Sequence, residues 1–206
     1  MDLTLSPVSL LIFITTIGLS IYTLNYNREL FAKFVLHPYS MIRNGYWYQI
    51  ITSGFIHNDY MHLIFNMMTF YFFAFNLEMR VGSFAFAAIY FISMVVADLP
   101  TIIKNKDNYN YSSVGASGAI AGILFSFIIF APNMKISLMF IPIGIPSPIF
   151  AILYLVYCHF GDRYAQDNVN HSAHLYGAVT GLLITIFLFP SAFGDFLAAL
   201  PYIFSN

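Results

Sequence analysis

A serine lies among small residues at the start of a long apolar segment. The stretch from Val114 to Gly122 is Val-Gly-Ala-Ser-Gly-Ala-Ile-Ala-Gly, which places Ser117 in its first turn. A hydroxyl in this setting either joins packed membrane helices or acts as a nucleophile where water is scarce. The choice depends on whether the rest of the chain brings a base to Ser117.

Other polar side chains occur near the starts of two further apolar segments. They are His57, His62 and Asn66 in one segment and His174 in the other. Polar side chains are costly in hydrocarbon, so each is a functional candidate. His62 and Asn66 are spaced i, i+4 and share a helix face. A histidine close to Ser117 would supply the base that activates a serine nucleophile.

The composition indicates an integral membrane protein. The chain has 206 residues, of which 59% are hydrophobic and 8% charged, whereas soluble domains carry about 25% charged residues. A net charge of −1 argues against a nucleic-acid partner. The single cysteine, Cys158, excludes an intrachain disulfide and a cysteine-based metal site. The N-terminus lacks the basic region of a cleavable signal peptide, so we expect the first apolar run to be retained.

Six segments approach the roughly 20 apolar residues that a spanning helix needs. We therefore predict an all-α membrane protein, a single domain over residues 1–206 that forms a compact six-helix bundle with a large loop between its first two helices. The approximate spans are Leu5–Leu24, Phe55–Leu77, Phe84–Ile103, Val114–Ala131, Ile136–Cys158 and Ala173–Phe189.

Prolines modify this pattern in two places. Pro142, Pro146 and Pro148 predict a kink or local unwinding in the fifth span. The apolar tail that begins at Pro190 is interrupted by Asp195 and Pro201, so we expect it at the membrane interface rather than as a seventh span.

Counting spans predicts that the polar residues converge. The second, fourth and sixth helices enter the membrane from the same side, so the residues near their starts share one leaflet below the long loops. Small residues four apart let helix backbones approach closely in lipid. If the fourth and sixth helices meet along their glycines, a hydrogen bond between Ser117 and His174 is feasible. These glycines are Gly118 with Gly122, and Gly177 with Gly181.

Four motifs in order resemble those of the rhomboid intramembrane serine proteases, and the resemblance covers nearly the whole chain. They are Gly115-Ala116-Ser117-Gly118, His57-x4-His62-x3-Asn66, Glu78-x3-Gly82 and Ala173-His174-x2-Gly177. The resemblance implies that Ser117 is the nucleophile of an acyl-enzyme mechanism and His174 its general base and acid. It also implies an oxyanion site formed by the Ser117 N–H, His62 and Asn66. It gives supporting or structural roles to His57, Glu78, Gly82, Gly115, Gly118, Gly177 and Gly181.

The same resemblance implies a setting. We expect a multi-pass protein of a bacterial plasma membrane that cuts transmembrane protein substrates and uses no metal or organic cofactor. The fifth helix and the loop over residues 161–170 would form the gate and cap through which a substrate helix arrives.

The chain departs from the family pattern in three respects. Tyr48-Gln49 stands where members often carry Trp-Arg. Ala121 stands where many have an aromatic ring that stacks on the catalytic histidine, which leaves open what orients His174. The long loops carry six of the eight basic residues, and this places them in the cytoplasm by the positive-inside rule, whereas the family topology places them outside. We favour the family topology.

Alternatives remain at this point. A catalytically inactive relative that binds membrane proteins is one, and a proton-coupled transporter that uses His57, His62 and His174 is another. The sequence has no His-Glu-x-x-His and no Gly-x-Gly-Asp motif, which disfavours metal-dependent and aspartyl intramembrane proteases. Asp98 is expected at a helix end, with a proton-handling role as the alternative. For His171 we favour a polar contact near the water boundary over a catalytic role.

Overall fold

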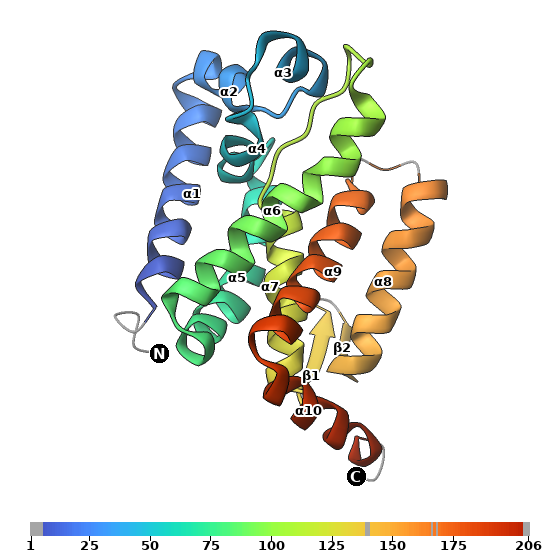
Figure 1. The fold of residues 1–206 in the computed structure, drawn as a ribbon. Coiled ribbons are helices and arrows are strands. Elements are labelled where there is room, and N and C mark those ends of the chain that lie inside the picture. Colours follow the sequence, from blue (N-terminus) through green and yellow to red (C-terminus); the bar gives the residue numbers. More distant parts are fainter. Residues whose placement is uncertain (1–5, 139–140, 166, 168, 204–206) are drawn as a thin grey trace.

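The computed structural model describes residues 6–138, 141–165, 167 and 169–203, and it forms a bundle of mainly upright helices (Figure 1). The predicted start of the first span, Leu5, lies outside these residues. The long helices are α1 (Pro7–Asn25), α5 (Tyr60–Val81), α6 (Ser83–Asn105), α7 (Ser117–Phe130), α8 (Ser147–Tyr164) and α9 (His171–Leu188).

Helix α7 is the most enclosed helix of the bundle. It packs most extensively on α9 and also on α6 and α5. Twelve of its 14 residues are buried, as expected for a helix that is hydrophobic on all sides. By length and composition, three helices of the described chain could cross a membrane, namely α1, α6 and α9. α7 is apolar but shorter, so the count of six spans stays a prediction.

Helices α7 and α9 meet along the glycines that their spacing singles out. A Cβ added at Gly177 would overlap the backbone of Gly118, and one added at Gly181 would overlap the backbone of Gly122. The two backbones therefore touch without intervening side chains. Further along the same contact, Ser126 and Thr185 join their hydroxyls in a buried hydrogen bond.

Glu78 ties the first three long helices together. Its side chain is 1% exposed and accepts hydrogen bonds from the backbone N–H groups of Val8 and Ser9, at 3.1 and 2.6 Å. These are first-turn N–H groups of α1, which lack partners within the helix. The hydroxyl of Ser83, the first residue of α6, donates a third bond at 2.6 Å. Gly82 makes the turn between α5 and α6 with φ +80°.

The long loop after α1 is itself helical, and this shifts the start of the second long helix. α5 begins at Tyr60 rather than Phe55 because the Asp59 side chain caps it by accepting from the His62 N–H at 2.8 Å. The loop contains α2 (Arg28–Phe34), α3 (Pro38–Asn44), α4 (Gln49–Thr52) and the 3₁₀ helix η2 (Ser53–Phe55).

The prediction of one helix over Ile136–Cys158 is wrong in its first half. Strands β1 (Lys135–Leu138) and β2 (Ile141–Pro146) pair antiparallel, and α8 begins only at Ser147. Prolines at 142 and 146 lack the N–H that a helix interior requires, and the isoleucines between them favour a strand. Pro148 is tolerated because it lies in the first turn of α8.

The C-terminal segment contains α10 (Pro190–Ala199) and the 3₁₀ helix η3 (Leu200–Tyr202). α10 packs on α7 and α9 at the end of the bundle where the chain terminates (Figure 1). Its ten residues rise about 15 Å, about half of the hydrocarbon thickness. This length agrees with the expectation that the tail is not a seventh span.

Candidate active site

Ser117 is the first residue of α7, and the backbone before it is shaped by Gly115. Gly115 has φ +115°, which favours glycine, and its N–H donates to the Ser53 carbonyl at 2.9 Å. A Cβ at Gly115 would lie 2.6 Å from Cε1 of His62. Glycine at this position thus permits both the turn into α7 and the close approach of the His62 ring.

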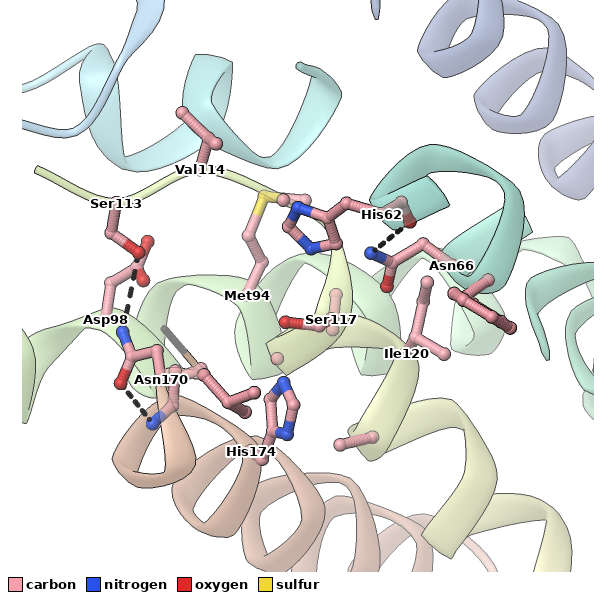
Figure 2. Close-up of a pocket in the computed structure, with 18 of the residues that line it drawn as sticks. His62, Asn66, Met94, Asp98, Ser113, Val114, Ser117, Ile120, Asn170 and His174 are labelled. Atoms are coloured by element: carbon pink, nitrogen blue, oxygen red, sulfur yellow. Dashed lines mark hydrogen bonds between the residues drawn. The ribbon is translucent and has the colours of Figure 1, made fainter. Parts of the chain in front are cut away.

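His174 lies in the first turns of α9 and faces Ser117. Figure 2 shows the serine hydroxyl and the imidazole ring directed toward one another across the α7–α9 contact. Among the described residues, neither side chain has a hydrogen-bond partner, and the atoms of both border an open cavity. The two side chains therefore lie next to the same cavity, and no hydrogen bond joins them in the structure.

His62 and Asn66 approach the same point from α5. Both point toward Ser117 in Figure 2, as their i, i+4 spacing predicts. The Asn66 amide nitrogen donates to the His62 carbonyl at 3.1 Å, which fixes the amide orientation and leaves its second N–H for another acceptor. Two polar side chains from one helix face thus lie near the serine.

All four groups line a single cavity of about 930 Å³. Its walls come from α5, α6, α7, α8, α9 and the loop before Ser117. The structure therefore brings polar residues from α5, α7 and α9 together around this cavity, as the counting of spans predicts. The expectation that Asp98 lies at a helix end is wrong, because α6 continues past it to Asn105; Asp98 lines the cavity beside Ser113 and Asn170 in Figure 2. Within the described residues, no group of three or more metal-ligating side chains occurs.

His57 does not line the cavity but lies behind His62. It is fully buried, and its Nδ1 lies 2.9 Å from the Ser20 hydroxyl of α1. Its ring meets the His62 ring edge to face at a centroid distance of 4.8 Å. His57 thus packs His62 against Gly115, in accord with a supporting position.

A ring from α8 lies beside His174, whereas α7 offers only the small side chain of Ala121. The Tyr154 ring stacks on the His174 ring with a centroid distance of 6.4 Å and an interplanar angle of 18°. Tyr154 also lines the cavity. Sequence analysis missed this residue because α8 is rich in aromatic side chains and its pattern does not show which ring faces inward.

Asn170, a second residue that was missed, joins α9 to its surroundings. Its side-chain oxygen accepts from the Ala173 N–H at 3.0 Å and so caps α9. Its amide nitrogen donates to Thr101 of α6 at 3.0 Å and, at longer range, to Tyr111 and Ser113 before α7. The signal was the asparagine one residue before a helix start, a common capping position.

His171 faces away from the cavity toward the loop that precedes α9. It is 3% exposed, and its Nε2 lies 3.1 and 3.2 Å from the two carboxylate oxygens of Asp167. The pKa of Asp167 is lowered, first by a hydrogen bond from the Val169 N–H and also by His171. The geometry fits the polar contact that was favoured for His171. Residues 166 and 168 of this loop, part of the expected cap, lie outside the described residues.

Comparison with known proteins identifies relatives for this arrangement. A sequence model of the Rhomboid domain matches residues 44–191. The putative rhomboid protease YdcA of Bacillus subtilis is 30% identical over 146 residues, which cover 70% of this chain and 68% of that protein.

Two other relatives are longer than this chain. Rhomboid protease GluP of Bacillus subtilis is 27% identical over 75% of this chain, and rhomboid protease AarA of Providencia stuartii is 28% identical over 72% of it. The matched parts cover only 29% and 58% of those two proteins.

Proposed function

This chain belongs to the rhomboid family, and from that premise we propose that it is an intramembrane serine endopeptidase. Its family and its long apolar helices make it an integral membrane protein. The observation that carries the proposal is the single cavity onto which Ser117, His174, His62 and Asn66 all open.

In the proposed reaction, the Ser117 hydroxyl attacks the carbonyl carbon of the scissile peptide bond while His174 takes its proton. The C–N bond then breaks, His174 passes the proton to the leaving amine, and an acyl-enzyme remains. Water, activated by His174, hydrolyses this ester and restores the serine. General base assistance of this kind contributes about 10²–10⁴ in rate.

The oxyanion of each tetrahedral intermediate would be held by three donors. The Ser117 N–H belongs to the first turn of α7, where backbone N–H groups have no partner within the helix. The positive end of the helix dipole adds to this field. The side chains of His62 and Asn66 would supply the other two donors. One such donor is typically worth about 10²–10³ in rate.

The proposed machinery is a dyad. In the described part of the chain, no carboxylate hydrogen-bonds the His174 ring, and Asp167 bonds His171 instead. A water-accessible cavity above Ser117 is compatible with a membrane location because α7 has only 14 residues. These rise about 21 Å, less than the ~30 Å hydrocarbon core, so α7 can begin below the membrane surface.

We further propose transmembrane protein segments as substrates and the plasma membrane of a bacterium as the location. Relatives from Bacillus subtilis and Providencia stuartii support the location. A relative named Rhomboid protein 1, mitochondrial, from Saccharomyces cerevisiae makes an organelle membrane the competing location. The long loops would face away from the cytoplasm, against their excess of basic residues.

Reconstitution in liposomes with a tagged single-span model substrate tests the activity. The substrate carries small residues near one membrane boundary. We expect the wild-type protein and the control Ser191→Ala, an exposed serine of α10, to cut it. Ser117→Ala should abolish cutting.

Other results would contradict the proposal. Binding of the substrate without cutting by the folded wild type would favour the inactive binding protein. Proton flux that survives Ser117→Ala, without cutting, would favour the transporter. Cutting that survives Ser117→Ala would mean another nucleophile.

A further inference from the structure

The His174 ring is held by packing rather than by hydrogen bonds. In the described chain its two nitrogens have no hydrogen-bond partner. The torsion that sets the plane of a histidine ring is broad, so neighbouring atoms must fix it. The proposed proton transfers need a fixed plane, because a misplacement of about 1 Å can cost on the order of 10² in rate.

Two rings approach His174 closely enough to fix it. His171, one turn earlier on α9, meets it at an angle of 69° and a centroid distance of 6.5 Å. The Tyr154 ring lies nearly parallel to it, at an angle of 18° and a centroid distance of 6.4 Å. The two centroid distances are nearly equal, but His171 belongs to the same helix as His174, whereas Tyr154 approaches it from α8. Tyr154 is therefore the ring neighbour that links the direction of the His174 ring to the docking of another helix.

Tyr154 is itself held in place by aromatic neighbours. Its ring lies 5.5 Å from the ring of Phe125 on α7 and 5.9 Å from that of Phe150 on α8. It belongs to the border of a buried cluster that includes Ala121, Phe125 and Phe150. The small side chain at Ala121 leaves room on α7 for a ring that arrives from α8.

We propose that Tyr154 is a positioning residue of this enzyme, whose ring keeps the imidazole of His174 directed at Ser117. This inference rests on the proposed serine protease function. It has a structural consequence, because α8 touches α9 much less extensively than α7 does and touches α7 only slightly. A shift of α8 away from α9 would take the ring off His174 and leave the base without its support.

Labelling of the full-length protein with a fluorophosphonate probe in detergent tests the role of Tyr154. The concentration dependence of labelling separates the maximal rate constant from the affinity for the probe. We expect Tyr154→Ala and Tyr154→Leu to lower the maximal rate constant about tenfold, the scale of one lost aromatic contact, with little change in affinity. Tyr154→Phe keeps the ring and should label at nearly the wild-type rate.

Phe160→Ala is the matched control, because Phe160 is an aromatic residue of α8 with an exposed side chain that does not line the cavity. Thermal unfolding of each variant shows whether it is folded, and the leucine variant retains more of the side-chain volume if alanine does not fold. A folded leucine variant that labels as fast as Phe160→Ala overturns the role of Tyr154. So does a phenylalanine variant that is as slow as alanine, because the hydroxyl would then matter instead of the ring. A wild type that takes no label overturns the proposed function itself.

Discussion

Helix α9 makes different kinds of contact with α7 and with α8, besides its packing on α6. On the α7 side, backbone lies against backbone at Gly177 and Gly181, where not even a Cβ fits. On the α8 side, the contact is made through side chains, including Tyr154 nearly parallel to His174 and Tyr157 nearly perpendicular to His171. The first contact fixes the separation of the α7 and α9 backbones, and the second fixes the direction of an imidazole ring.

This difference separates stability from activity. Glycine contacts leave no freedom for adjustment, because backbone atoms cannot move aside as a flexible side chain can. A substitution on the α7 side should therefore destabilise the fold. A change on the α8 side should leave the fold and slow the chemistry, as the Tyr154 variants are designed to show.

Among the substitutions that test this comparison, we expect Gly181→Ala to have the largest effect on stability. The added methyl group would overlap the backbone of Gly122, and overpacking of this kind costs about 1–3 kcal/mol or more. Gly18→Ala is the matched control, because Gly18 lies in a long helix with nothing within 4 Å of the added Cβ. Alanine there should be neutral or stabilising by about 0.5–1 kcal/mol.

Thermal unfolding in detergent measures both glycine variants. We expect a lower midpoint for Gly181→Ala and an unchanged or higher one for Gly18→Ala. Equal midpoints in the two variants would show that the α7–α9 contact adapts, and the contrast with the α8 side would disappear.

The smallest effect on stability is expected at the loop before α9. There the Asp167 carboxylate accepts a hydrogen bond from the Val169 N–H and lies within hydrogen-bond distance of His171 Nε2. The folded pKa of Asp167 lies below its ordinary value. The ionised carboxylate therefore contributes stability that is complete above the ordinary pKa, about 4, and is lost as the pH falls through the lowered folded value. The bond is exposed on the Asp167 side, so only local opening should respond.

Hydrogen exchange of the start of α9, corrected for intrinsic rates, measures this opening. We expect protection in the wild type to fall as the pH drops below about 4, and Asp167→Asn to show lower, nearly pH-independent protection. Asp162→Asn serves as the control, because its contact with Lys104 is longer, at 3.7 Å. A wild type and an Asp167→Asn variant with the same pH dependence would remove any role for the carboxylate.

Much of the candidate site could be predicted because it depends on local spacing. The i, i+4 pair His62 and Asn66 and the glycine pairs of α7 and α9 each encode a helix face, and span counting places those faces in one leaflet. The predictions that failed concern features that depend on tertiary structure or on prolines that interrupt a helix. The hairpin at 135–146 replaced a helix because prolines remove the N–H groups that a helix needs.

Tyr154 shows most clearly what cannot be predicted from the sequence. The absence of a ring at Ala121 could be noticed in the sequence, but the ring that replaces it comes from another helix. Which of the tyrosines and phenylalanines of α8 faces His174 depends on how α8 rotates and docks, and helical periodicity does not determine this in a helix with polar and apolar residues on most sides. A three-dimensional arrangement was needed to find it.

The central claim is that His174 activates Ser117 for attack on a carbonyl. Fluorophosphonate labelling of the detergent-solubilised protein tests it directly. The wild type, Ser117→Ala, His174→Ala and the control Ser191→Ala are compared, after thermal unfolding has shown that each variant is folded. We expect label on the wild type and on Ser191→Ala, and none on Ser117→Ala or His174→Ala. Label that persists in Ser117→Ala, or a folded wild type that takes none, would contradict the account.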